Sequence, residues 1–207
     1  MKINKNTILP LDKFIEFALY DKDTGYYMKK NPFGAEGDFI TAPNITRLFS
    51  EIIAVWIITF WKSLGSPKKF NILELGAGNG EMMKVIISTL KNFPECFNSC
   101  KFLIHEKSTF LKKQQHKNLK LENVIWEDDI KKFDSCPTIF LANEFFDALP
   151  IKQFFKKNEG WVERFVNLKE IDHAKFEEQF IDIKKIEKEL NFEISKEQEI
   201  IEYSPSS

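Results

Sequence analysis

The order of apolar and polar residues predicts helices in the first third of the chain. Apolar side chains recur every three or four positions across residues 11–19, and residues 21–25 form a polar stretch that ends in glycine. Residues 48–60 carry a broader apolar face, which Gly65-Ser66-Pro67 interrupts. Both patterns are typical of amphipathic helices with defined ends. Between them, residues 29–44 mix glycine and proline with charged residues, which indicates an ordered loop.

Short apolar runs alternate with amphipathic segments from residue 70 onward. Strands are predicted at residues 70–75, 102–105, 124–126 and 138–142, with helices at residues 81–90 and 109–116. Strands that alternate with helices imply right-handed crossover connections, which produce a parallel sheet. The pattern therefore predicts an α/β fold with a mostly parallel sheet and helices on both of its faces.

The pattern changes beyond Pro150. Residues 151–156 and 161–168 are strand-like and flank Asn158-Glu159-Gly160, an arrangement typical of a β-hairpin. We therefore expect three regions, which are an N-terminal helical region at residues 1–66, a sheet core at residues 67–150, and a hairpin with a charged C-terminal segment at residues 151–207.

Composition and charge exclude several classes of protein. Of the 207 residues, 43% are hydrophobic and 29% are charged, so the chain can bury one large core or two small ones. A formal net charge of −1 gives no general attraction to nucleic acid or to an anionic membrane. The longest apolar run, Ile52–Trp61, has about half of the roughly 20 residues that span a bilayer, so we expect a buried helix and no membrane insertion.

The cysteines and the first residues bear on the compartment. Cys96, Cys100 and Cys136 are odd in number and form no familiar zinc pattern with a histidine pair. Met1–Asn6 has neither the apolar core of a signal peptide nor the character of a transit peptide. These features predict a cytoplasmic protein without a metal site.

A glycine-rich loop follows the first predicted strand. Asn71-Ile72-Leu73-Glu74-Leu75 runs into Gly76-Ala77-Gly78-Asn79-Gly80, at the sheet edge where α/β proteins bind ligands. A dinucleotide loop needs its third glycine at position 81, but Glu81 stands there and would repel a diphosphate. The spacing and the acidic Glu74 instead favour S-adenosylmethionine, which has no phosphate and carries an ammonium and a sulfonium. NAD binding is the less favoured interpretation.

Acidic residues follow the next two strands. Glu106 lies about 26 residues after Gly80, where a carboxylate can accept hydrogen bonds from both ribose hydroxyls. The alternative is a solvated carboxylate paired with Lys107. After the third strand, Asp128 or Asp129 can accept a hydrogen bond from the adenine amine. The alternative there, an acidic turn or helix cap, has equal weight.

Three motifs occur together and in order. They are Gly37-Asp38-Phe39-Ile40-Thr41-Ala42-Pro43, Glu74-Leu75-Gly76-Ala77-Gly78-Asn79-Gly80 and Asn143-Glu144-Phe145-Phe146-Asp147-Ala148-Leu149-Pro150. With supporting matches such as Trp161-Val162-Glu163-Arg164, they resemble the MidA-like methyltransferases from about Leu11 to Pro205. That family includes the mitochondrial protein-arginine methyltransferase that assists complex I assembly. The resemblance implies a Rossmann-like class I methyltransferase sheet with S-adenosyl-L-methionine as cofactor.

The chain departs from the family pattern at several positions. Asn44 stands where the family usually has Glu, Ser50 where Gly is usual, and Ala77 and Asn79 where Pro and Arg are common. Family members also continue past the motif that here reads Glu202-Tyr203-Ser204-Pro205. The resemblance therefore implies that the later sheet strands of the family are absent from this chain.

Catalysis is expected from the residues that follow the fourth strand. Methyl transfer from a sulfonium mainly requires that donor and acceptor be aligned, so no protein nucleophile is needed. If the acceptor is arginine, as the resemblance suggests, carboxylates must orient its guanidinium and accept a proton. We expect this of Glu144 and Asp147, which share one face if Glu144–Leu149 forms a turn of helix. Asn143 is expected to contact the cofactor or the acceptor. The alternative is a helix start that Asn143 caps.

The loop before the second helix is a candidate lid over the cofactor. Asp38, Phe39 and Thr41 lie in a segment bounded by Gly37, and such a segment can close over a binding crevice. The structural alternative has Phe39 in the core and Thr41 capping the following helix. The two roles are compatible.

Three functional hypotheses follow from the sequence. The first is a protein methyltransferase, arginine-directed by resemblance, that acts on a respiratory complex I subunit. The others are a non-catalytic assembly factor that binds S-adenosylmethionine, and an inactive truncated remnant. A protein substrate is the expected partner and nucleic acid is not. A homodimer, or another chain that supplies the C-terminal region, remains open.

Overall fold

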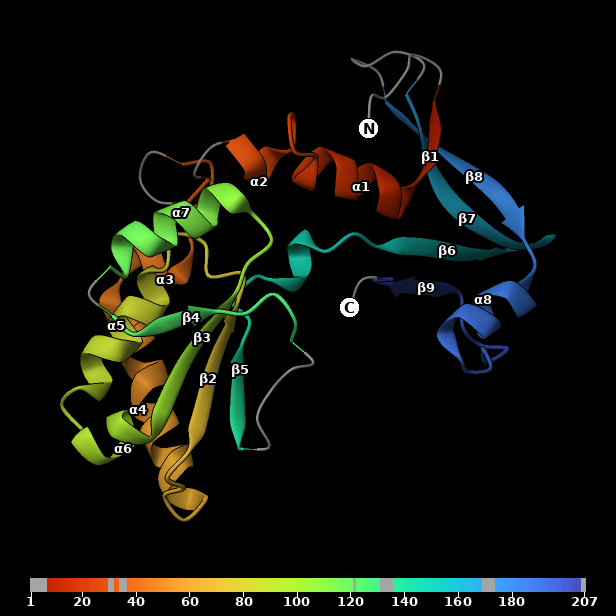
Figure 1. Ribbon diagram of the computed structural model, residues 1–207. Coiled ribbons are helices and arrows are strands. Elements are labelled where there is room, and N and C mark those ends of the chain that lie inside the picture. Colours follow the sequence, from red (N-terminus) through yellow and green to blue (C-terminus); the bar gives the residue numbers. More distant parts are fainter. Residues whose placement is uncertain are drawn as a thin grey trace. The chain divides into compact units, whose positions relative to one another are not determined.

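In a computed structural model the chain forms two compact units (Figure 1). The described residues are 7–29, 32–33, 37–120, 122–130, 136–168 and 174–205. Tyr26–Phe146 form the first unit, called the glycine-loop unit below. Met1–Gly25 and Asp147–Ser207 form the second, called the hairpin unit.

The glycine-loop unit contains a four-stranded parallel sheet. Its strands are β2 (Phe70–Leu75), β3 (Cys100–His105), β4 (Val124–Trp126) and β5 (Thr138–Leu141), in the order β4-β3-β2-β5. The four strands predicted from the sequence are confirmed to within two residues. Within the described residues β2 lies at the centre, pairing with β3 on one side and β5 on the other. This order places the end of β2 beside the ends of β3 and β5.

Helices pack on one face of this sheet. They include α4 (Arg47–Ser63), α5 (Glu81–Leu90) and α6 (Pro94–Ser99), which lie on one side of the strands in Figure 1. A buried core forms between them, to which β2 contributes Phe70 and Ile72. The predicted α/β fold with a parallel sheet is therefore confirmed. The other face carries Leu73 and Leu103, which are buried with Phe145 packed against them.

The remaining helices of this unit are short or lie at the loop end of the sheet. They are α2 (Tyr26–Lys29), α3 (Ala42–Ile45) and α7 (Thr109–Asn118). The hydroxyl of Ser108 caps α7 by accepting a hydrogen bond from the N–H of Leu111 at 3.1 Å. Thr46 caps α4 in the same way, and Gly65 with a φ of 80° follows the end of α4. Polar caps and a left-handed glycine are ordinary helix boundaries.

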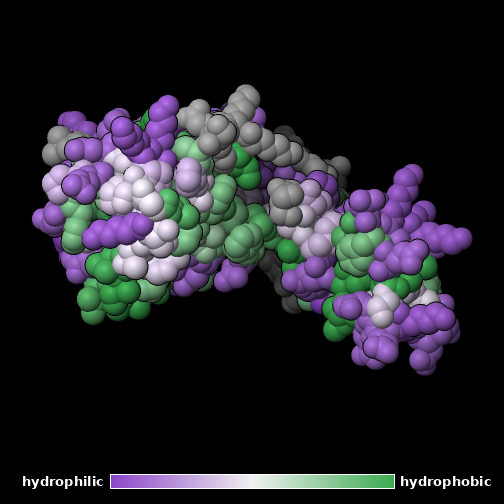
Figure 2. Space-filling view, turned by 90° about the horizontal axis from the view of Figure 1, so that it is seen from below, coloured by the Kyte–Doolittle hydropathy of each residue, from purple (hydrophilic) through white to green (hydrophobic). Residues whose placement is uncertain are grey.

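Helix α4 is apolar around most of its circumference. Ala54, Ile57 and Trp61 are buried in the core, whereas Ile52 and Trp56 are at least half exposed. Figure 2 shows hydrophobic residues gathered in patches on one face of the molecule. No helix among the described residues is long and apolar enough to cross a membrane.

The hairpin unit joins the two ends of the chain in one antiparallel sheet. Its elements are β1 (Ile8–Pro10), α1 (Leu11–Tyr20), β6 (Lys152–Lys157), β7 (Gly160–Asn167), β8 (Lys175–Ile181), α8 (Ile183–Leu190) and β9 (Ile200–Tyr203). The predicted hairpin is confirmed as β6 and β7. Strand β1 also pairs with β7, with Ile8 opposite Asn167. The hairpin unit thus combines segments that are distant in the sequence. The three regions expected at residues 1–66, 67–150 and 151–207 stay a prediction.

The Trp161-Val162-Glu163-Arg164 motif has structural contacts in β7. Trp161 is buried in a core cluster with Phe154. Glu163 is buried, and its Oε1 lies 3.5 Å from Nζ of Lys152. The guanidinium of Arg164 lies 4.2 Å from the centre of the Phe155 ring, close enough for a cation–π contact. These contacts organise the hairpin sheet.

We predict that Phe154→Ala destabilises the protein far more than Phe155→Ala. Phe154 is fully buried, whereas its neighbour Phe155 is half-buried on the opposite face of the strand. Truncating a buried phenylalanine costs about 3–5 kcal/mol of unfolding free energy because a cavity remains. Urea unfolding of both variants measures the difference, and equal losses would contradict the packing described for β6.

Candidate functional site

The glycine loop turns sharply where β2 ends. Gly76 has a φ of 65°, a left-handed conformation that favours glycine, and its N–H donates to the carbonyl of His105 at 2.9 Å. A Cβ atom at position 76 would lie 2.7 Å from the ring of Phe145. The loop therefore depends on glycine for both its conformation and its contact with the chain after β5. Gly78 and Gly80 also have positive φ, and α5 begins directly after Gly80.

Glu74 lies buried near the end of β2, directly before this loop. Its side chain is inaccessible to solvent, and its Oε2 has no hydrogen-bond partner among the described residues. Burial raises the pKa of Glu74 to about 8, opposed by the backbone N–H of Met83 and assisted by the charge of Glu106. An unsatisfied buried carboxyl oxygen is costly unless a ligand or another donor meets it.

Glu106, at the end of β3, is buried and held on both oxygens. Its Oε1 accepts from the N–H of Ser108 at 2.8 Å, and its Oε2 accepts from Nε2 of Gln115 at 3.0 Å. Burial raises the pKa of Glu106, while these two donors oppose the shift. The alternative of a solvated carboxylate paired with Lys107 does not fit this burial.

Asp128 and Asp129 lie in the turn after β4. The carboxylate of Asp128 is exposed and paired with the ammonium of Lys112, which lowers the pKa of Asp128. The N–H of Asp129 donates to Oε1 of Glu127 at 3.1 Å. The contact of these two residues with adenine stays a prediction. The ion pair with Lys112 also restricts the orientation of the Asp128 carboxylate.

The candidate lid contacts the glycine loop through Asn44. Thr41 is buried, and its Oγ1 accepts from Nδ2 of Asn44 at 2.9 Å. The Oδ1 of Asn44 in turn accepts from Nδ2 of Asn79 at 2.8 Å. Asn44 and Asn79 are two of the positions that depart from the family pattern, and here they are partners. Asp38 is exposed and accepts a hydrogen bond from the hydroxyl of Tyr26.

The predicted catalytic residues follow β5 without the expected full turn of helix. Glu144 is exposed and has a φ of 53°, so its backbone cannot belong to a right-handed helix. A 3₁₀ turn begins only at Phe146–Ala148. The premise that Glu144 and Asp147 share one face of a helical turn is therefore wrong. Glu144 belongs to the glycine-loop unit, which ends at Phe146, and Asp147 begins the second segment of the hairpin unit.

Several residues of the site were not identified from the sequence. Gln115 is fully buried and binds both Glu106 and the carbonyl of Gly78. The signal for it was available, because Gln115 interrupts the apolar series formed by Leu111 and Leu119 at intervals of four residues. Phe145 packs on Gly76 although the motif suggested only its neighbours as functional.

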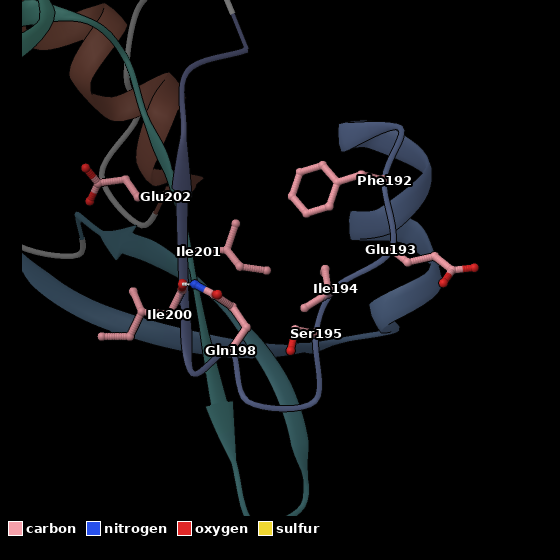
Figure 3. A pocket seen from close by; sticks show the side chains of 8 residues that line it. All are labelled: Phe192, Glu193, Ile194, Ser195, Gln198, Ile200, Ile201 and Glu202. Carbon is pink, nitrogen blue, oxygen red and sulfur yellow. Dashed lines mark hydrogen bonds between the residues drawn. The ribbon is translucent and has the colours of Figure 1, made fainter.

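A surface hollow in the hairpin unit lies apart from these residues in the sequence. It has a volume of about 330 Å³ and lies between the chain after α8 and strand β9. Figure 3 shows Phe192 and Ile194 on one side of it and Ile201 on the other. Among the described residues, no group of three or more His, Cys, Asp or Glu side chains is arranged to hold a metal ion.

Comparison with known proteins gives matches to one class of enzyme. Residues 52–207 match the model of a family described as "Putative S-adenosyl-L-methionine-dependent methyltransferase". The chain is 30% identical over 191 residues to protein arginine methyltransferase NDUFAF7, mitochondrial, of Xenopus tropicalis, covering 81% of this chain. It is 33% identical over 170 residues to the Caenorhabditis elegans homologue, covering 70% of this chain.

These relatives are considerably longer than the chain. The matched region spans 44% of the Xenopus protein and 39% of the Caenorhabditis protein. A crystal structure from Burkholderia thailandensis bound to S-adenosyl-homocysteine has the same fold, with a TM-score of 0.73 at 23% identity. That similarity covers 95% of this chain and 52% of the other.

We predict that Gly76→Ala impairs ligand binding and folding more than Gly65→Ala. Both glycines have φ between 60° and 85°, so both variants carry a similar backbone cost. Only the alanine at position 76 would also collide with the Phe145 ring, since nothing lies within 4 Å of a Cβ at position 65. Calorimetric titration with S-adenosylhomocysteine and urea unfolding compare the two, and equal effects would contradict the Phe145 contact.

A second prediction concerns the pH dependence of stability. Unfolded Glu74 loses its proton near pH 4.5, whereas folded Glu74 keeps it to about pH 8. Stability should therefore fall as pH rises through this window, by on the order of 1 kcal/mol per pH unit. Glu74→Gln, which cannot ionise, should lose this dependence and gain stability relative to wild type between pH 5 and 8. Glu81→Gln is the control, and a Glu74→Gln curve parallel to wild type would refute the expectation.

Proposed function

The chain belongs to the family of S-adenosyl-L-methionine-dependent methyltransferases, and from this premise we propose that it methylates arginine side chains of a protein. The observation that carries the proposal is the left-handed backbone of the exposed Glu144, next to Phe145, whose ring packs on Gly76. Strained non-glycine residues concentrate at functional sites. The contact of Phe145 with Gly76 therefore links the segment that carries the exposed Glu144 to the glycine loop.

The residues present fit S-adenosylmethionine. When bound, this cofactor supplies a methyl group on a sulfonium. Glu74 offers a buried carboxyl oxygen without a partner among the described residues, at the end of the strand that leads into the glycine loop. We propose that Glu74, the loop glycines and Glu106 hold the cofactor. Asp128 and Asp129 would contact its adenine, and Asp38 and Thr41 would belong to a lid.

We propose arginine as the methyl acceptor because carboxylates follow β5, beyond the residues proposed to hold the cofactor. A guanidinium is charged at every physiological pH, so a site for it needs carboxylates that orient it and accept a proton. We assign Glu144 to this role and Asn143 to hydrogen bonding with the acceptor, and the same role of Asp147 stays a prediction of the sequence. The names of the relatives, protein arginine methyltransferases, support this choice.

A narrower proposal concerns the protein that is methylated. The relatives carry the name NDUFAF7 and are mitochondrial, and the resemblance drawn from the motifs points to complex I assembly. We therefore propose a respiratory complex I subunit as the protein substrate. A cytoplasmic location of this chain stays a prediction of the sequence.

We predict that Glu144→Asn abolishes arginine methylation without destabilising the fold. Asparagine adopts the left-handed backbone more readily than glutamate, so the variant should unfold at the same or a higher urea concentration than wild type. Transfer of labelled methyl groups to a complex I subunit measures activity, and a lysine-only peptide tests the acceptor class. S-adenosylhomocysteine affinity should change by less than about threefold, because the lost group contacts the acceptor.

Glu159→Asn, in the turn between β6 and β7, provides the matched control. Glu159 is exposed and lies in the hairpin turn, so this variant should keep wild-type turnover. Wild-type turnover of Glu144→Asn would remove Glu144 from the proposed mechanism. Methylation of the lysine-only peptide would show that lysine is an acceptor and contradict the assignment to arginine.

A further inference from the structure

Gln115 lies fully buried at the junction of the cofactor loop and β3. Its Nε2 donates to the carbonyl of Gly78 at 2.9 Å and to Oε2 of Glu106 at 3.0 Å. Its Oε1 accepts from the indole N–H of Trp126 at 2.8 Å. Both N–H groups and the carbonyl oxygen of this one amide are therefore used, by groups at the ends of three different segments.

The three partners determine the orientation of the amide. Two acceptors, Gly78 and Glu106, face the nitrogen, and one donor, Trp126, faces the oxygen. A flipped amide would set its oxygen against two other oxygens and its nitrogen against an N–H. Only one orientation therefore satisfies the site, and it holds Glu106 in a defined position relative to the glycine loop.

A second contact fixes the other oxygen of Glu106. The N–H of Ser108 donates to Oε1 at 2.8 Å, while the hydroxyl of Ser108 donates to the carbonyl of Tyr27 at 2.5 Å. The carboxylate is thus clamped between the start of α7 and Gln115 in the middle of the same helix. The backbone N–H of Lys107 also stabilises the charged form of Glu106. A carboxylate offers about four acceptor sites, so these three donors leave capacity for a further one.

The position of Gln115 in the helix argues against a packing role. Leu111 and Leu119, one turn before and after it, are buried apolar residues that fill the core. An apolar side chain would continue this series without the cost of burying an amide. The polar residue is therefore placed where its hydrogen bonds are needed.

We infer that Gln115 is a positioning residue that presents the Glu106 carboxylate to the ribose hydroxyls of the cofactor. The inference rests on the proposed role of Glu106 in ribose binding. Gln115 acts through Glu106 and through the carbonyl of Gly78, without contact to the ribose. Loss of the Gln115 amide leaves the Glu106 carboxylate free to rotate. The affinity for ligands that carry both ribose hydroxyls then falls.

The test compares two ligands that differ only at the ribose. Dissociation constants of S-adenosylhomocysteine and its 2′-deoxy analogue are measured calorimetrically on the full chain. Gln115→Met should raise the dissociation constant of S-adenosylhomocysteine by about 10-fold or more, which is the scale of a hydrogen bond to a charged group. The dissociation constant of the 2′-deoxy analogue should rise far less. The preference for the ribose hydroxyl should therefore collapse. Gln114→Met, one residue earlier on α7, is the matched control and should keep the preference for the ribose hydroxyl.

Gln115→Glu is a second variant with the same shape. It sets a carboxylate against Glu106 and should lose the same preference, so the inference remains testable even where Gln115→Met fails to fold. Equal weakening of both ligands by the Gln115 variants would show a merely structural role and overturn the inference.

Glu106→Ala separates this inference from the proposed function. If Glu106→Ala removes the preference and the Gln115 variants keep it, only the role of Gln115 is refuted. If Glu106→Ala itself keeps the preference, Glu106 does not bind the ribose, and the role of Gln115 is refuted with it. Failure of wild type to bind S-adenosylhomocysteine would refute the proposed cofactor site as a whole.

Discussion

The parallel pairing of β2 between β3 and β5 is the constraint on which the rest of the site depends. In this register Glu74 lies opposite Ile104 on one side and Leu141 on the other. The three strands therefore end at one edge, where a buried carboxyl, a clamped carboxylate and the strained segment after β5 come together. Any shift of β2 by one residue would turn Glu74 to the other face of the sheet.

Local chemistry made much of the fold predictable. Strand-length apolar runs, the glycine loop and the Asn158-Glu159-Gly160 turn are short-range signals, and the structure has a strand or turn at each. Helix α6 was missed because it is six residues long and opens with Pro94. The pairing of β1 with β7 was missed because it joins residues more than 150 positions apart, and no local pattern reports such contacts.

Side-chain partnerships were harder to predict than backbone elements. Glycine spacing and acidic residues at strand ends pointed to Glu74 and Glu106, but burial and the orphaned oxygen of Glu74 depend on packing. Asn44 and Asn79 departed from the family at separate positions, and only the structure shows that they bond to each other. Both side chains are neutral amides, so this link between the segment after Thr41 and the glycine loop is insensitive to salt.

The left-handed backbone of Glu144 has an evolutionary consequence. A glutamate in this conformation is less stable than an asparagine or glycine at the same position. Under neutral drift that preserved the fold alone, glutamate would be displaced by residues that suit the turn. Descendant sequences that have lost methyl transfer should therefore accumulate asparagine or glycine at this position, whereas those under selection for the reaction should retain the acid. Under the proposed role of Glu144, the residue type at this position should distinguish family members that catalyse methyl transfer from those that do not.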